Sequence, residues 1–139
     1  CPGADGFFLS ARGNQCLKVY VDESRTWDAA KTLCETQGLE LAKPQDAVGL
    51  RKYLQERYGD KQYWVGGKAT GSAYEWIRDG QQLSSSDPLW ADDEPDATAS
   101  GNCLYLRSYA SFVTSQPDQP YWDQPCYIQF YPVCEVVLH

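Results

Sequence analysis

Four acidic side chains crowd around a single proline in the segment DDEPDATASGNC, residues 92–103. They are Asp92, Asp93, Glu94 and Asp96. Carboxylate oxygens are the ligands that a hard cation such as calcium prefers. Acidic surface loops are also common where no ion binds. The segment therefore predicts a cation site, a solvated acidic loop, or the remnant of a site that no longer works.

The whole chain is acidic, which restricts the partners that it can bind. Its 139 residues carry a formal charge of −7, with 19 acidic side chains against 12 basic ones. Nucleic acids and anionic membrane surfaces both attract basic faces, so this balance argues against both as partners. No apolar run approaches the length of a membrane span. We therefore expect no nucleic-acid partner and no membrane span, whereas cations are permitted.

The six cysteines indicate disulfides rather than a metal centre. They are scattered along the chain without a Cys-x-x-Cys pair, and the only histidine is His139, so a zinc site is not expected. Three disulfides predict an oxidising compartment and therefore a secreted or extracellular protein. The sequence starts at Cys1 and contains no methionine, which we interpret as a mature, processed chain. Six cysteines allow fifteen pairings.

The first half of the chain has the pattern of two helices beside short strands. Thr26 can cap a helix that ends near Gly38, and a second helix is expected from about Asp46 to Tyr58, before Gly59. The apolar stretches that predict strands here are residues 7–9, 16–21 and 39–41, with a turn at 12–14 between the first two.

The second half of the chain has the pattern of strands and long loops. Asp79-Gly80 is the turn of a predicted hairpin. Strands are expected at 63–67, 103–109 and 131–138, and loops at 84–102 and 115–126. Long loops in a compact domain are usually functional or disordered. Helices followed by strands predict an α+β fold, and the length predicts a single domain over residues 1–139.

Several motifs occur in an order that is typical of one family. TWDAAKTLC (26–34) precedes YWVGG (63–67), and Trp76, Trp90, Glu94-Pro95-Asp96, YWDQPC (121–126) and YPVCE (131–135) follow. This order resembles the C-type lectin-like domain over essentially the whole chain. Any one of these motifs is a weak signal, whereas the complete ordered set is specific.

The resemblance implies a fold and a cysteine pairing. The fold is two helices with antiparallel sheets and a long loop region. The implied disulfides are Cys1–Cys16, which marks the long form of the domain, Cys34–Cys134 and Cys103–Cys126. The Cys34–Cys134 bridge would close most of the chain and stabilise it by about 4–5 kcal/mol in the entropic model.

The resemblance also implies a calcium site, which this sequence matches in part. Glu94-Pro95-Asp96 lies at the position of the family's ligand triplet, and Asp123, three residues before Cys126, lies at that of a family aspartate. Trp122 replaces the family asparagine, and an indole cannot bind calcium. The family's downstream glutamate is missing, but the amide of Asn102 offers an oxygen nearby. The implied calcium ligands are Glu94, Asp96, Asp123 and Asn102.

In calcium-dependent members of the family, two sugar hydroxyls chelate the ion and hydrogen-bond the same ligands. The implied carbohydrate contacts are therefore Glu94, Asp96 and Asp123. Trp122 is a candidate to stack on a sugar, and the alternative is that it packs within the protein. Because Glu94 and Asp96 both accept hydrogen bonds when ionised, the usual preference between mannose-like and galactose-like hydroxyls cannot be read from the triplet.

We therefore expect a secreted, carbohydrate-binding C-type lectin that takes part in innate-immune recognition of microbial glycans through a partly degenerate calcium site. Its partner would be a glycan or glycoprotein. The alternative is a calcium-independent C-type lectin-like domain that binds a protein. An enzyme is not expected, because the only histidine is terminal and nucleophilic catalysis requires a base beside serine or cysteine.

Overall fold

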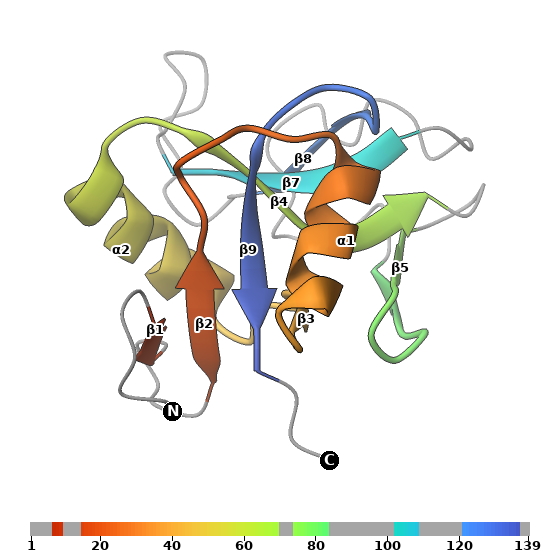
Figure 1. Ribbon diagram of the computed structural model, residues 1–139, viewed down its shortest axis with the longest axis horizontal. Coiled ribbons are helices and arrows are strands. Elements are labelled where there is room, and N and C mark those ends of the chain that lie inside the picture. Colours follow the sequence, from red (N-terminus) through yellow and green to blue (C-terminus); the bar gives the residue numbers. More distant parts are fainter. Residues whose placement is uncertain (1–6, 10–14, 70–73, 84–101, 109–120, 137–139) are drawn as a thin grey trace.

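The computed structural model describes residues 7–9, 15–69, 74–83, 102–108 and 121–136. Within these ranges, Figure 1 shows helices α1 and α2 on opposite sides of the strands β2 and β9. The predicted α+β fold is confirmed. The elements are β1 (Phe7–Leu9), β2 (Cys16–Val19), α1 (Trp27–Thr36), β3 (Glu40–Leu41), α2 (Ala47–Tyr58), β4 (Gln62–Ala69), β5 (Tyr74–Trp76), β6 (Gln82–Leu83), β7 (Asn102–Arg107), β8 (Tyr121–Pro125) and β9 (Tyr131–Glu135).

Local signals set both ends of α1, as the sequence predicts. The Thr26 hydroxyl accepts a hydrogen bond from the Ala29 amide at 3.3 Å, which satisfies one of the amides that the first turn leaves without a partner. Gly38 follows the helix with φ +76°, a conformation that glycine adopts at low cost. One face of the helix buries Trp27, Ala30 and Cys34.

Helix α2 begins and ends in the same manner. The Asp46 carboxylate accepts a hydrogen bond from the Gly49 amide at 3.1 Å, and Gly59 terminates the helix with φ +79°. The helix buries Leu50 and Leu54, so apolar burial holds it against the rest of the domain. The predicted helix over 46–58 is confirmed.

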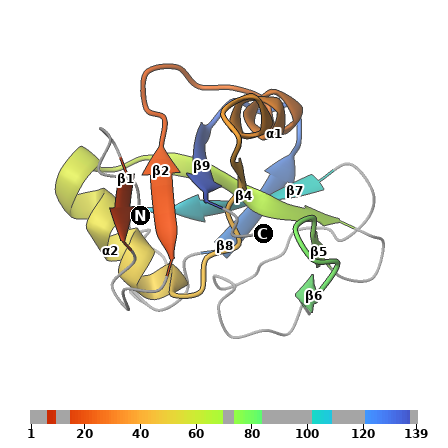
Figure 2. The ribbon, with the colours of Figure 1, turned by 60° about the horizontal axis from the view of Figure 1, so that its bottom comes forward.

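The sheet is mixed, with one parallel pair beside the expected antiparallel ones. Its strands are hydrogen-bonded in the order β1-β2-β9-β4-β5-β6, with β3 on β9, and β7 linking β4 to β8. All these pairs are antiparallel except β4 with β9, where Tyr63 pairs with Tyr131 and Trp64 with Pro132 in parallel. Figure 2 shows β4 crossing the middle of the molecule, where it joins the β2–β9 strands to the β7–β8 pair.

Residues 121–125 form a strand, so the predicted loop over 115–126 is wrong in this part. Strand β8 pairs antiparallel with β7, with Leu104 opposite Asp123 and Tyr105 opposite Trp122. The prolines and polar residues around this segment predict a loop. Pairing with β7, the preceding strand, outweighs that local preference.

Two glycines of β4 allow the close packing behind the YWVGG motif. A Cβ atom at Gly67 would lie 2.7 Å from Cδ2 of Leu104, and one at Gly66 would lie 2.9 Å from the carbonyl oxygen of Leu41. Real Cβ atoms do not approach other atoms this closely, so a side chain at either position would force strands apart.

The buried aromatic side chains form the centre of the domain beside α1. Trp27 and Trp64 are almost fully buried, and their indole nitrogens donate to the carbonyl oxygens of Val65 and Arg25, both at 2.9 Å. Trp64 also meets Tyr105 edge-on, with ring centroids 6.1 Å apart. Buried indoles need such partners. These two hydrogen bonds therefore hold the start of α1 against β4.

Two of the three implied disulfides are present. They join Cys34 to Cys134 and Cys103 to Cys126. The third implied bridge, Cys1–Cys16, involves Cys1, which lies outside the described residues. The predicted turn at 12–14 also lies outside them, as does the predicted loop at 84–102 up to residue 101.

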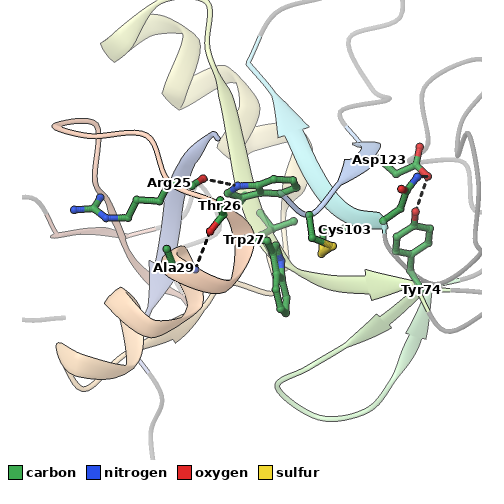
Figure 3. The surroundings of a disulfide bond; sticks show 11 residues. Arg25, Thr26, Trp27, Ala29, Tyr74, Cys103 and Asp123 are labelled. Atoms are coloured by element: carbon green, nitrogen blue, oxygen red, sulfur yellow. Dashed lines mark hydrogen bonds between the residues drawn. A yellow bond between two sulfur atoms is a disulfide. The ribbon is translucent and has the colours of Figure 1, made fainter. Parts of the chain in front are cut away.

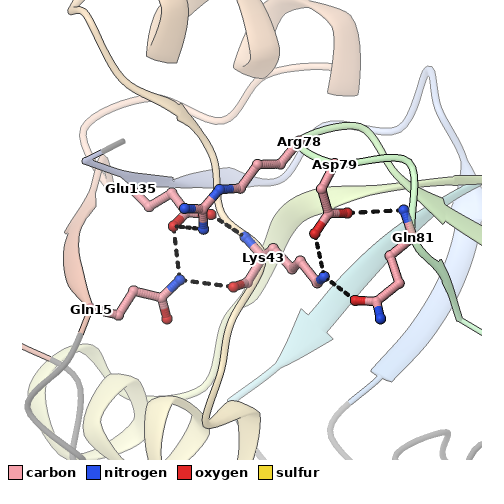
Figure 4. A network of polar contacts seen from close by, with 6 residues as sticks. All are labelled: Gln15, Lys43, Arg78, Asp79, Gln81 and Glu135. Atoms are coloured by element: carbon pink, nitrogen blue, oxygen red, sulfur yellow. Dashed lines mark hydrogen bonds and ion pairs between the residues drawn. The ribbon is translucent and has the colours of Figure 1, made fainter. Parts of the chain in front are cut away.

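A polar network ties the ends of several elements together (Figure 4). Glu135 is 1% exposed and accepts hydrogen bonds from Gln15 Nε2 at 2.9 Å, from the Lys43 amide at 2.7 Å and from Arg78 Nη1 at 2.7 Å. The Lys43 ammonium also pairs with Asp79 at 2.6 Å, and this hydrogen bond lowers the pKa of the Asp79 carboxyl. The buried carboxylate therefore has charged and neutral donors around it, as burial of a charge requires.

Candidate functional site

Of the residues implied for the calcium site, the structure describes only those in β7 and β8. Asn102 is the first residue of β7 and Asp123 lies in β8. Glu94 and Asp96, the triplet ligands implied by the resemblance, lie outside the described residues. The geometry of the site is therefore the geometry of Asp123 and of the side chains around it.

The structure brings Asp123 and Asn102 together, and adds Tyr74. Asp123 is 0% exposed. Its Oδ2 atom accepts hydrogen bonds from the Tyr74 hydroxyl at 2.5 Å and from Asn102 Nδ2 at 3.1 Å. Figure 3 shows the Tyr74 hydroxyl pointing at this carboxylate from β5. Three strands, β5, β7 and β8, thus each supply one side chain to the same point.

Tyr74 was not predicted as a site residue. In the sequence it is one position in an alternating strand pattern, and nothing local distinguishes it from a core tyrosine. One signal was available, because a buried tyrosine hydroxyl almost always has a hydrogen-bond partner. Which partner it has depends on the β7–β8 pairing, and local sequence does not specify that pairing.

The arrangement holds a hard oxygen ligand in a fixed orientation. Hydrogen bonds to an ionised acceptor are short and strong, and partners of this kind orient the ligands of metal sites. The Asn102 amide presents its nitrogen to Asp123, and its oxygen is the atom that calcium would use. Asp123 and Asn102 are therefore suited to be two ligands of one cation.

Trp122 and Asp123 are neighbours in the sequence but not at the site. Successive side chains of a strand point to opposite faces, so Trp122 lies on the other face of β8. The Arg107 guanidinium carbon is 3.7 Å from the centre of the Trp122 ring, and the ring packs beside the buried cluster that contains Trp64 and Tyr105. These contacts favour the packing interpretation of Trp122.

A complete metal shell would need residues beyond those that the structure describes. Within the described ranges, no three His, Cys, Asp or Glu side chains gather around one point. Calcium takes about six to eight oxygen ligands, and Asp123 with Asn102 supplies a minority of them. The two residues fit part of a calcium site, and the remaining ligands would have to come from Glu94, Asp96, backbone oxygens and water.

A comparison with models of protein families identifies one family. The model of the Lectin C-type domain family matches residues 23–136. A comparison with curated protein sequences gave no match.

Neither helix in the described ranges has the length and apolar content needed to cross a membrane.

Solved structures share the fold over almost the whole chain. SPL-1 in complex with GlcNAc is 26% identical, with a TM-score of 0.73 over 97% of this chain and 95% of that one. The C-type lectin domain of murine dendritic cell inhibitory receptor 2, in complex with N-glycan, is 19% identical, with a TM-score of 0.73 over 99% of each chain. A calcium-independent type II antifreeze protein is 23% identical, with a TM-score of 0.69 over 97% and 92%.

Proposed function

We propose that this chain, which belongs to the Lectin C-type domain family, is an extracellular domain that binds carbohydrate, including glycans of microbial surfaces. The family consists of non-enzymatic binding domains. The observation that supports the proposal most strongly is the buried Asp123 carboxylate, held by Tyr74 and Asn102 at the position of the family's ligand aspartate. A structure that is 26% identical to this chain is a complex with GlcNAc.

Calcium would be held by Glu94, Asp96, Asp123 and Asn102. The first two precede Asn102 by eight and six residues. Six extended residues span up to about 20 Å, so the chain is long enough to bring both carboxylates to the Asp123 side of β7. When bound, calcium would supply a positive ion that the hydroxyl oxygens of the sugar can coordinate. Three carboxylates exceed the charge of the ion, which favours its binding electrostatically.

The protein's own side chains give the proposed site its rigidity. Asp123 is fixed by two donors from two other strands, so it need not reorganise when an ion arrives. Glu94 and Asp96 would accept hydrogen bonds from the sugar. Trp122 lies on the opposite face of β8 from Asp123 and packs against Arg107 and the buried cluster, so it is not part of the proposed site.

Glycan binding by the purified domain should depend on calcium and on Asp123. On a glycan array, binding in millimolar calcium should be lost in a chelator such as EGTA, and Asp123→Asn should weaken it about tenfold or more. The asparagine keeps an acceptor for Tyr74 and Asn102 but removes the charge. A loss of this size corresponds to about 1.4 kcal/mol, close to the lower end of what one hydrogen bond to a charged group contributes.

Asp60→Asn is the matched control, because Asp60 is an exposed acid between α2 and β4. It should bind glycans as the wild type does. Glycan binding that survives both the chelator and Asp123→Asn would contradict the proposed mechanism.

A calcium-independent domain that recognises a protein is the second candidate. Trp122 stands where calcium-dependent members have a ligand asparagine, and its ring is engaged by Arg107 and by the buried cluster. The structural neighbours include a calcium-independent protein, for which the likeness shows the fold alone. A protein partner that is retained in chelator, with no glycan bound in calcium, would favour this function.

A further inference from the structure

A small pocket lies on the α1 side of the domain, away from the candidate calcium site. It has a volume of about 170 Å³ and lies between α1, β3 and the start of the β5–β6 turn. Figure 1 shows α1 above β3. The lining residues are Lys31, Glu35, Glu40, Leu41 and Ile77. Three of the five are charged and two are apolar.

The charges around the pocket do not cancel. Lys31 Nζ pairs with Glu35 Oε1 at 3.0 Å, and the nearby Arg78 pairs with Glu135 at 2.7 Å. Glu40 has no cation partner within the described part of the chain. Its Oε2 atom is buried and accepts no hydrogen bond there. Glu40 is therefore the carboxylate that leaves this region with an excess negative charge.

The backbone pairing makes the excess charge more costly. Glu40 is the cross-strand partner of Glu135 in the β3–β9 pair, and like charges in such positions repel each other. A buried acceptor without a hydrogen bond adds a desolvation cost. A cation placed in the pocket would offset the repulsion between the two carboxylates, so the pocket is complementary to a positively charged group.

The size and lining of the pocket point to a single side chain. Pockets for drug-sized ligands usually have volumes of about 300–1,000 Å³, well above that of this pocket. A guanidinium group is planar and more weakly hydrated than an ammonium group, so it loses less when it leaves water for a partly enclosed pocket. The apolar stem of a long basic side chain can pack on Leu41 and Ile77.

We propose that this pocket is a docking site for an arginine side chain of a partner protein, with Glu40 as its counter-ion. The pocket shares no residue with the proposed carbohydrate site. The proposal does not depend on calcium or on the identity of the glycan.

The test is an NMR titration of the ¹⁵N-labelled domain with Nα-acetyl-arginine methylamide. The amide signals of Glu35, Leu41 and Ile77 should shift with a millimolar dissociation constant. The citrulline analogue, which has the same shape without the charge, should leave them unchanged, and the lysine analogue should bind more weakly. Glu40→Gln should weaken the arginine analogue about fivefold or more, a factor in the range of one ion pair at a protein surface.

Glu56→Gln is the control, because Glu56 is an exposed acid on α2 and its removal changes the net charge by the same amount. It should bind the arginine analogue as the wild type does. Equal shifts with the arginine and citrulline analogues would overturn the proposal on the wild type alone. Unchanged affinity in Glu40→Gln, or shifts confined to residues outside the pocket, would overturn it as well.

Discussion

Replacing Cys34 and Cys134 together with alanine should lower the free energy of unfolding by about 4–5 kcal/mol. Their disulfide joins residues 100 positions apart, so its removal restores most of the freedom of the unfolded chain. Both half-cystines are fully buried, and truncation to alanine also removes packing contacts. The loss should appear as a lower midpoint in guanidinium unfolding followed by circular dichroism.

The second disulfide is the matched control for the first. Cys103 and Cys126 are separated by 23 positions, and a loop of this length gives about 3 kcal/mol in the same entropic model. The Cys103→Ala/Cys126→Ala variant should therefore lose less stability than the Cys34→Ala/Cys134→Ala variant. An equal or larger loss for the shorter loop would show that local strain or packing, rather than loop closure, sets the contribution of these bridges.

Arg78→Ala should lower the free energy of unfolding by about 2–3 kcal/mol. The substitution leaves the carboxylate of Glu135, which is 1% exposed, without its cation. Breaking a fully buried pair costs about 3–5 kcal/mol. The smaller value is expected here because the Arg78 side chain is 30% exposed, and because Gln15 and the Lys43 amide still donate to Glu135. Urea unfolding at neutral pH measures the change.

A double-mutant cycle separates the ion pair from the rest of the network. Glu135→Gln removes the buried charge and keeps one acceptor oxygen, which can accept from Gln15 or from the Lys43 amide but not from both, because they donate to different oxygens of Glu135. In that background, Arg78→Ala should cost less than about 1 kcal/mol, the range of an exposed polar contact. If Arg78→Ala costs the same in both backgrounds, the arginine stabilises the turn at Asp79 by packing and does not act through Glu135.

Local signals in the sequence predicted the elements with strong end markers. Thr26 and Gly38 bound α1, and Asp46 and Gly59 bound α2, because capping depends on residues within one turn of the helix. The hairpin at Asp79-Gly80 follows from the same kind of local preference. The disulfides came from the family resemblance instead, since fifteen pairings were otherwise open.

The features that the sequence did not predict depend on pairing between separate strands. Strand β8 contains Pro125 and polar side chains that locally predict a loop, and only its pairing with β7 makes it a strand. The parallel pairing of β4 with β9 joins residues 63–64 to 131–132, a register for which the sequence has no local marker. Mixed sheets therefore cannot be distinguished from antiparallel ones by alternation alone.

The candidate site likewise combines residues that were predicted with one that was missed. The family resemblance implied Asp123, three residues before Cys126, as a site residue, and the structure places Asn102 beside it. Tyr74, which donates to the same carboxylate from β5, was missed because that contact requires three strands to assemble. Trp122 follows the strand alternation to the opposite face. Glu94 and Asp96 lie outside the described residues, and their roles stay predictions.

The central claim is that Asp123 belongs to a working calcium site, and thermal unfolding tests it most directly. The wild type and Asp123→Asn would be melted in excess calcium and in EGTA. A ligand that binds only the folded state, at about a hundredfold excess over its dissociation constant, stabilises that state by about 2.7 kcal/mol. This raises the melting temperature of a domain of this size by several degrees. We expect that shift in the wild type and none in Asp123→Asn. No shift in the wild type at millimolar calcium, or equal shifts in both proteins, would contradict the account.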